Sequence, residues 1–236
     1  MTKQPSNRLP PQVYIQARDH LLNTDADARE IYAWSRTGRK PPETPEHLAG
    51  EIIWIILCAG RSAQAARTIE RRVRAALDAG ESAVTAFGYR AKAAAIDRAW
   101  RERTLDFQKL HAVLKADNPA LLLDWCESIP FVGAITKYQL AKNLGRDDVT
   151  KPDIHLCRLA GIADDAKVSA SARFAVCMQF CAPLAAASGD TIATVDSILW
   201  LGANKGVFVV DAAAGPIAFN PTGNNRGSIY LSPTPA

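Results

Sequence analysis

The sequence predicts an all-α fold. Apolar residues recur at intervals of three and four along most of the chain, and helix-start signals recur between these runs. Thr44-Pro45 and Asn118-Pro119 are the clearest signals, because in each a capping side chain precedes a proline at the first helical position. Only the tail breaks the pattern: residues 207–210 and 228–231 lie among glycine, asparagine and proline, and we expect short strands or extended segments there.

Each helical run has a recognisable beginning and end. One helix begins at Pro45 and ends at Gly60. Ser62 begins the next, whose apolar face is flanked by arginines, so that it is amphipathic with a basic side. Further helices, joined by short polar loops, are expected over residues 89–101, 107–115, 119–127, 134–143, 154–162, 169–186 and 191–201.

Length and composition favour a soluble globular protein. The chain has 236 residues, a formal net charge of +4 and 48% hydrophobic residues. A chain of this size can be stabilised by its hydrophobic core without disulfides or structural metal sites. Its longest apolar run, residues 52–59, is far short of the roughly 20 needed to span a membrane. The polar start of the chain lacks a secretory signal, so we expect a cytoplasmic protein. The five cysteines show no disulfide or zinc spacing and are expected to be reduced core residues.

Residues 122–160 carry the most specific pattern. A helix is followed by the turn Ile129-Pro130-Phe131-Val132-Gly133 and by a second helix that Gly145 ends. The first amides of that second helix have no helical partners, and such a helix start can bind a phosphate. Pro152-Asp153-Ile154-His155 then places an aspartate 20 residues after Gly133 (153 − 133), with Arg158 shortly after it.

The hairpin and the correctly spaced aspartate resemble the helix-hairpin-helix DNA glycosylases, the superfamily that includes endonuclease III and the 8-oxoguanine glycosylases. Residues 57–64 are similar, more weakly, to the helix junction from which those enzymes insert side chains into DNA. The resemblance covers about 150 residues and implies a two-lobed, all-α body. We expect an N-terminal helix and loop over 1–44, a glycosylase core over 45–205 and a tail over 206–236.

Asp153 is the catalytic residue that the resemblance implies. Cleavage of an N-glycosidic bond builds positive charge on the sugar, which a nearby carboxylate stabilises while it orients or deprotonates a water. The same residue, directly before an apolar run, also has the signature of a helix N-cap. The two roles are compatible, because a helix N-terminus favours an ionised carboxylate.

Departures from the family pattern narrow the expected activity. Family members that also cut the DNA backbone carry a lysine two residues after the hairpin glycine, where this chain has Ile135. The resemblance therefore favours a monofunctional, water-using glycosylase, with Lys137 or Lys151 as alternative amines for a lyase step. Cys177 and Cys181 alone do not make the four-cysteine cluster motif, so no iron–sulfur cluster is expected. A monovalent cation at the hairpin is the one ion that the resemblance allows, and no other metal is expected.

The implied partner is double-stranded DNA containing a modified base, bound by a monomer without a membrane. Residues at the hairpin, the aspartate segment and the helix junction are the expected DNA contacts: Phe131, Val132, Gly133, Ala134, Ile135, Lys137, His155, Arg61, Gln64 and Arg67. Aromatic and amide side chains are the expected base pocket: Trp54, Tyr138 and Gln139. The sequence does not identify which base is excised. Repair of damaged DNA and removal of a deliberately modified base are both consistent with the pattern. A non-catalytic DNA-binding protein, in which Asp153 only caps a helix, is the alternative.

Overall fold

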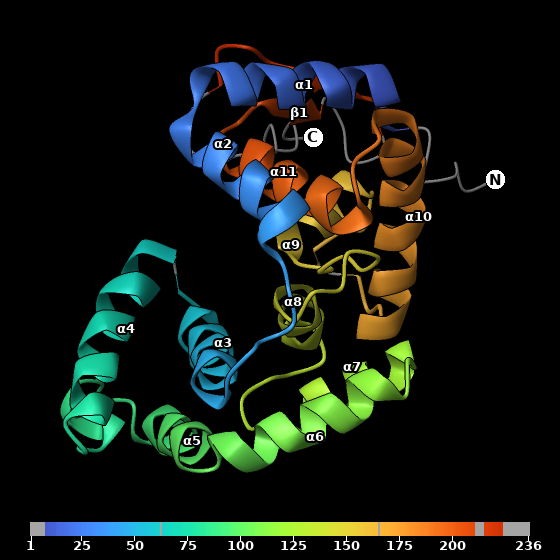
Figure 1. Cartoon of the computed structure of the whole chain (residues 1–236). Coiled ribbons are helices and arrows are strands. Elements are labelled where there is room, and N and C mark those ends of the chain that lie inside the picture. The colour runs from blue at the N-terminus through green and yellow to red at the C-terminus, as the bar shows by residue number, and fades with distance from the viewer. Residues whose placement is uncertain (1–7, 62, 165, 211–214, 224–236) are drawn as a thin grey trace. The chain divides into compact units, whose positions relative to one another are not determined.

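A computed structural model describes residues 8–61, 63–164, 166–210 and 215–223. Within these ranges the protein is all-α, as predicted, with eleven α-helices and one two-stranded sheet (Figure 1). The expected helix start at Ser62 and the expected extended segment 228–231 lie outside the described residues.

The contacts divide the chain into two compact units. Unit 1 comprises Met1–Arg39 together with Arg146–Ala236, and unit 2 comprises Lys40–Gly145. The segments expected from the sequence, 1–44, 45–205 and 206–236, follow the chain in order, whereas the contacts group both ends of the chain in unit 1. The hairpin therefore belongs to unit 2 and Asp153 belongs to unit 1.

Unit 1 contains the helices from both ends of the chain. Its described elements are α1 (Pro11–Thr24), α2 (Ala26–Ala33), the π-helical turn η2 (Trp34–Gly38), α9 (Ile154–Leu159), α10 (Ala170–Ser188), α11 (Ile192–Asn204), β1 (Phe208–Val210) and β2 (Ile217–Phe219). The two strands pair antiparallel. β1 matches the expected extended segment, whereas β2 was not predicted, because three residues in a glycine- and proline-rich stretch carry no alternation.

Helices α1, α10 and α11 enclose the core of unit 1. Tyr14, Phe180 and Phe208 are among its fully buried side chains. The buried carboxylate of Asp190 accepts hydrogen bonds from the hydroxyls of Tyr14 (3.0 Å) and Tyr32 (2.7 Å), which fixes the N-terminal helices to the loop before α11. The apolar α10 is long enough to cross a membrane by composition, but one face of it packs into this core.

Unit 2 is built around its first helix. Its described elements are α3 (Pro45–Cys58), α4 (Ala63–Asp78), the 3₁₀ turn η3 (Ala83–Thr85), α5 (Arg90–Arg101), α6 (Arg103–Lys115), α7 (Pro119–Ser128) and α8 (Thr136–Asn143). The apolar α3 packs against α4, α5, α6 and α8.

The two predicted caps of unit 2 are confirmed. The Thr44 side chain accepts the N–H of His47, and the Asn118 side chain accepts that of Ala120. These bonds satisfy helix-end amides that would otherwise lack partners. The Asn118 cap fixes where α7 begins, and α7 leads directly into the hairpin.

Candidate functional site

Asp153 caps α9 with one of its two carboxylate oxygens. Oδ1 accepts the N–H groups of His155 (3.0 Å) and Leu156 (3.1 Å). Oδ2 lies 3.7 Å from the Nζ atom of Lys151, and 15% of the Asp153 side chain is exposed. The cap thus occupies one oxygen and leaves the other beside a cation, so a structural role and a chemical role can coexist.

The segment before Asp153 is fixed to α11. The N–H of Lys151 donates to Oδ2 of the buried Asp196 (3.0 Å). Further back, the carbonyl of Asp147 accepts the N–H of Ala193 (2.9 Å). The chain is therefore held on both sides of the Lys151 and Asp153 pair, by α11 and by the cap.

His155 lies half-buried in the first turn of α9. Burial, the largest effect, lowers its pKa below the usual 6.5, while the charge of Asp153 opposes that shift. Its buried Nδ1 atom has no hydrogen-bond partner among the described residues. A largely neutral imidazole at pH 7 can contact a phosphate only as a neutral hydrogen-bond donor.

The hairpin turn joins α7 to α8 and is held by its own main chain. The N–H of Val132 donates to the carbonyl of Ile129 (2.9 Å), and the N–H of Lys137 to the carbonyl of Gly133 (3.0 Å). The N–H of Gly133 is also used, because it donates to Oγ1 of Thr136 (2.8 Å). The helix α8 begins at Thr136 rather than at the expected residue 134.

Two consecutive main-chain amides lie directly before α8. Those of Ala134 and Ile135 make no hydrogen bond within the described part of the chain. A Cβ atom added to Gly133 would meet no atom within 4 Å, so the fold does not require glycine there. The carbonyl oxygens of Ile129 and Gly133 already accept hydrogen bonds, and the turn gives no separate support for the expected cation.

Phe131, at the centre of the hairpin turn, has a left-handed backbone with φ of 65°. Its ring is 41% exposed and meets the ring of Tyr89 edge to face, with 6.3 Å between centroids. Tyr89 meets Phe87 in the same way (6.4 Å), and the Arg61 guanidinium lies over the Phe87 ring (4.9 Å). This row links two predicted DNA contacts, Arg61 and Phe131, through two aromatic residues that the sequence analysis missed. The sequence signal that could have identified them is the presence of an aromatic residue on each side of Gly88, between two helical patterns.

Lys137 points back toward α7. Its ammonium forms an ion pair with Glu127 (2.5 Å) and lies 5.5 Å from the centroid of the Tyr138 ring. The hydrogen bond to Glu127 raises the pKa of Lys137 above its ordinary value. A protonated, paired amine is a poor nucleophile. Ile135, at the family's lysine position, is half-buried at the N-cap of α8.

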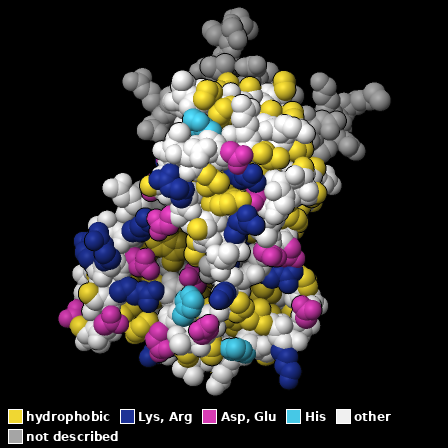
Figure 2. Space-filling view, turned by 45° about the horizontal axis from the view of Figure 1, so that its top comes forward, with side chains coloured by type: hydrophobic (Ala, Val, Ile, Leu, Met, Phe, Trp, Pro, Cys, Tyr) yellow, Lys and Arg dark blue, Asp and Glu magenta, His cyan; other side chains and the backbone are white. Residues whose placement is uncertain are grey.

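The basic face predicted for α4 is exposed. Gln64 and Arg67 lie on it, whereas Val73 and Leu77 are buried beneath. Figure 2 shows basic side chains interspersed with acidic ones on the face it displays, not a continuous basic surface. Arg74 pairs with Glu70 at 3.6 Å in this way.

The three residues expected to line a base pocket all belong to unit 2. Trp54 is half-buried on α3, and Tyr138 is buried on α8. Gln139 donates from its amide to Oδ1 of Asn143 (2.8 Å), whose own amide donates to the Glu51 carboxyl group (2.7 Å). Trp54 and Gln139 are therefore both partly exposed, and the Gln139 amide nitrogen is engaged.

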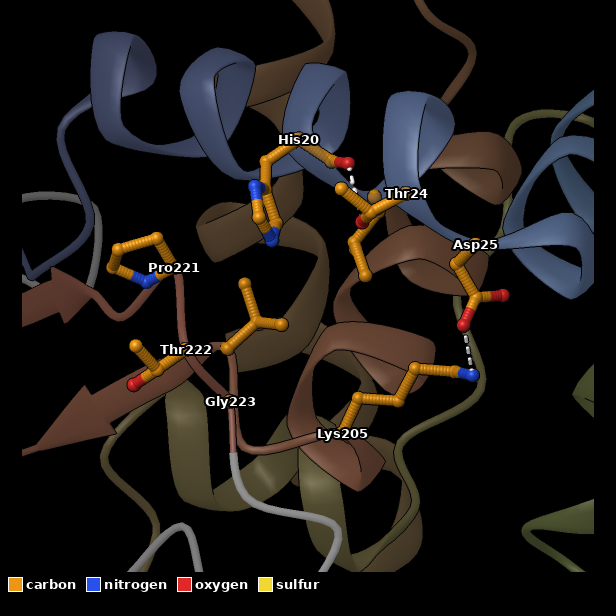
Figure 3. Close-up of a pocket in the computed structure, with 9 residues that line it drawn as sticks. His20, Thr24, Asp25, Lys205, Pro221, Thr222 and Gly223 are labelled. Carbon is orange, nitrogen blue, oxygen red and sulfur yellow. Dashed lines mark hydrogen bonds and ion pairs between the residues drawn. The ribbon is translucent and has the colours of Figure 1, made fainter.

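A surface pocket of about 300 Å³ lies in unit 1, and none of the candidate site residues lines it (Figure 3). Several of the polar groups that line it are paired within the protein. Lys205 forms an ion pair with Asp25, and the hydroxyl of Thr24 donates to the carbonyl of His20 (2.8 Å). The pocket offers no unpaired charge to a ligand.

The fold is similar to that of a solved DNA glycosylase/lyase. The chain is similar to the 8-oxoguanine glycosylase/lyase of Methanocaldococcus jannaschii, whose structure holds a 15-mer DNA containing 8-oxoguanine. The TM-score is 0.59 and the identity 17%, over 79% of this chain and 95% of that one. No family model matches the sequence, and no curated protein is significantly similar to it.

Proposed function

We propose that the protein is a monofunctional DNA glycosylase, which extrudes a modified base and hydrolyses its N-glycosidic bond. One observation carries the proposal. On a fold shared with a DNA glycosylase, Asp153 caps α9 with Oδ1 and keeps Oδ2 beside Lys151. The cap therefore leaves one carboxylate oxygen, beside a cation, for the chemistry of bond cleavage.

The chemistry assigned to Asp153 follows from the charge that the reaction develops. When the bond between the base and C1′ breaks, the base leaves with the electron pair and the sugar becomes an oxocarbenium-like cation. The carboxylate of Asp153 stabilises that charge through Oδ2. It then accepts a proton from the water whose oxygen bonds to C1′. Transfer of that proton, through solvent, to the base anion restores the carboxylate and leaves the free base and an abasic site.

Each unit is proposed to contain groups that suit DNA binding. The free amides of Ala134 and Ile135 suit a backbone phosphate at the helix start. Arg61, at the end of the aromatic row, and Arg67, on α4, supply positive charge. His155 is proposed to donate a neutral hydrogen bond near Asp153. These contacts offset the few kcal/mol, roughly, that extruding a base costs.

The water-using mechanism is supported by the state of the hairpin. Ile135 stands two residues after the hairpin glycine, where glycosylase/lyases of this type carry a lysine, and Lys137 is paired with Glu127. Neither side chain supplies a free amine, so we assign no Schiff-base step to the hairpin.

The substrate is proposed to be duplex DNA with a modified base. The glycosylase/lyase of M. jannaschii was crystallised with 8-oxoguanine DNA, which makes this lesion the first to test. Alkylated, deaminated and hypermodified bases complete the panel.

Base release from this panel tests the proposal, with Asp153→Asn as the matched variant. Asparagine is as good an N-cap as aspartate but carries no negative charge. We expect base release from at least one duplex, strand breakage only after alkali, and a loss of about 100-fold or more in Asp153→Asn. Tight binding without base release from any duplex would instead indicate a DNA-binding protein.

The Lys151 amine favours one second candidate, a bifunctional glycosylase/lyase. In that mechanism the amine would attack C1′, the base would leave and Asp153 would take a proton from the ammonium group. Borohydride trapping distinguishes the two functions. A covalent adduct in the wild type that is absent in Lys151→Met would establish the lyase, and Lys167→Met, an exposed lysine of unit 1, is the control.

A further inference from the structure

Unit 1 exposes two large apolar side chains among its described residues, Trp34 and Ile154. Ile154 directly follows Asp153. Trp34 is 40% exposed and begins the π-helical turn η2, and short π-helical segments are frequent at functional sites. The next side chain, Ser35, is buried and donates from Oγ to Oγ1 of Thr194 on α11 (3.2 Å), so the backbone that presents Trp34 is anchored.

One face of the Trp34 ring is covered by a cation. The Arg39 guanidinium lies 4.8 Å from the ring centroid. Its Nη2 atom donates to Oγ of Ser197 (2.7 Å) and to the carbonyl of Ala193 (3.2 Å), which fixes it to α11. Burial lowers the pKa of Arg39 to about 10, so the group stays charged at pH 7. The guanidinium thus covers one side of the indole, and the exposed part of the ring is available to a second planar group.

Trp34 and Asp153 are connected through α11. Both η2 and α9 pack against this helix. Asp196 lies next to Ser197 in sequence, and it accepts the Lys151 N–H. The segments that carry Trp34, Arg39 and Asp153 are therefore each hydrogen-bonded to residues 193–197 of α11, within one compact unit.

We propose that Trp34 is the residue on which the extruded base stacks before its bond to the sugar is cleaved. The proposal rests on the glycosylase function given above. A fixed, partly exposed indole backed by a guanidinium offers a planar face to a nucleobase and positive charge to the polyanionic strand. An aliphatic protein partner would gain from the indole but not from the charge of Arg39 and of the neighbouring exposed Arg36.

Base release by Trp34→Ala and Trp34→Phe, on a duplex that the wild type cleaves, tests the proposal. We expect kcat/KM to fall by about 5- to 100-fold in Trp34→Ala, the worth of one base–aromatic stacking contact, and to be largely restored in Trp34→Phe. Binding of the modified duplex to Asp153→Asn should quench tryptophan fluorescence, and the added Trp34→Phe change should remove that quenching. Leu121→Ala, which removes an equally exposed apolar side chain from α7, is the control and should leave kcat/KM unchanged.

The outcomes separate this inference from the function on which it rests. If the wild type releases no base from any duplex, the glycosylase function fails and the inference fails with it. If the wild type is active while Trp34→Ala stays within twofold of it, the inference alone is wrong. Loss of activity together with a lowered unfolding temperature, and without loss of fluorescence quenching in Trp34→Phe, would also overturn it in favour of a structural role.

Discussion

The ammonium nitrogen of Lys151 lies 3.7 Å from Oδ2 of Asp153, while Oδ1 of the same carboxylate caps α9. The two oxygens are therefore distinguishable by position, one fixed by the main chain and one available to react. The N-cap geometry alone cannot separate a catalytic aspartate from a structural one, but replacements that keep or remove the cap can.

Asp153→Asn and Asp153→Ala are expected to be equally inactive but unequally stable. Asparagine keeps the two hydrogen bonds to the start of α9, whereas alanine loses them at a cost of about 1 kcal/mol in unfolding free energy. Denaturant unfolding and single-turnover base release measure the two effects. If activity followed stability, with Asp153→Asn nearly as active as the wild type, the residue would be a cap alone. Thr191→Ala, which removes the N-cap side chain of α11, shows how much activity the loss of a cap costs by itself.

Gly133→Ala is expected to weaken DNA binding without changing stability. The added Cβ meets no protein atom within 4 Å and the backbone is not left-handed, so the unfolding temperature should change by less than about 2 °C. The methyl group would stand beside the free amides of Ala134 and Ile135 and hold a phosphate away, which we expect to weaken duplex binding about tenfold. Titration of a labelled duplex together with thermal unfolding checks both values. Unchanged affinity would remove the hairpin from the DNA-binding surface.

Features of this protein that depend on neighbouring residues could be predicted from the sequence. The Thr44 and Asn118 caps act within three residues, and the apolar spacing of α3 and α4 is a property of one helix at a time. The hairpin and its spaced aspartate are likewise visible along the chain. For these reasons the all-α fold and the N-cap role of Asp153 followed from the pattern alone.

Contacts between distant residues could not be predicted in the same way. The partner of Lys137 is Glu127, on the helix before the hairpin, and the backing of Trp34 is Arg39, fixed by α11. Such pairs depend on how helices pack, which no local pattern reports. The hydrogen bond from the Gly133 N–H to the Thr136 hydroxyl was not predicted, because its acceptor is a side-chain oxygen and not a main-chain carbonyl.

Phe131→Gly is expected to be more stable than Phe131→Ala. Both variants lose the edge-to-face contact with Tyr89, but only alanine keeps the cost of a left-handed backbone at φ 65°, which is about 1–2 kcal/mol. After the entropy cost of glycine is subtracted, we expect a difference of about 1 kcal/mol in unfolding free energy. Leu121, exposed within α7, supplies the control, because there alanine should be the more stable of the two. Equal stability of the two Phe131 variants would mean that the turn relaxes to a different backbone conformation.

The pKa of His155 makes stability depend on pH. Burial lowers this pKa in the folded state below 6.5, against the opposing charge of Asp153 and with the help of the positive charges of Arg158 and Lys151. The unfolded chain therefore binds the proton first as pH falls, so the unfolding free energy decreases from about pH 7 until the lower, folded pKa is passed. His155→Gln should reduce the loss of unfolding free energy between about pH 7.5 and 5.5, measured by denaturant titration at each pH. His111→Gln, at an exposed position on α6, is the control and should leave that loss as in the wild type. An unchanged loss in His155→Gln would show that the imidazole becomes protonated as readily in the folded protein as in the unfolded chain.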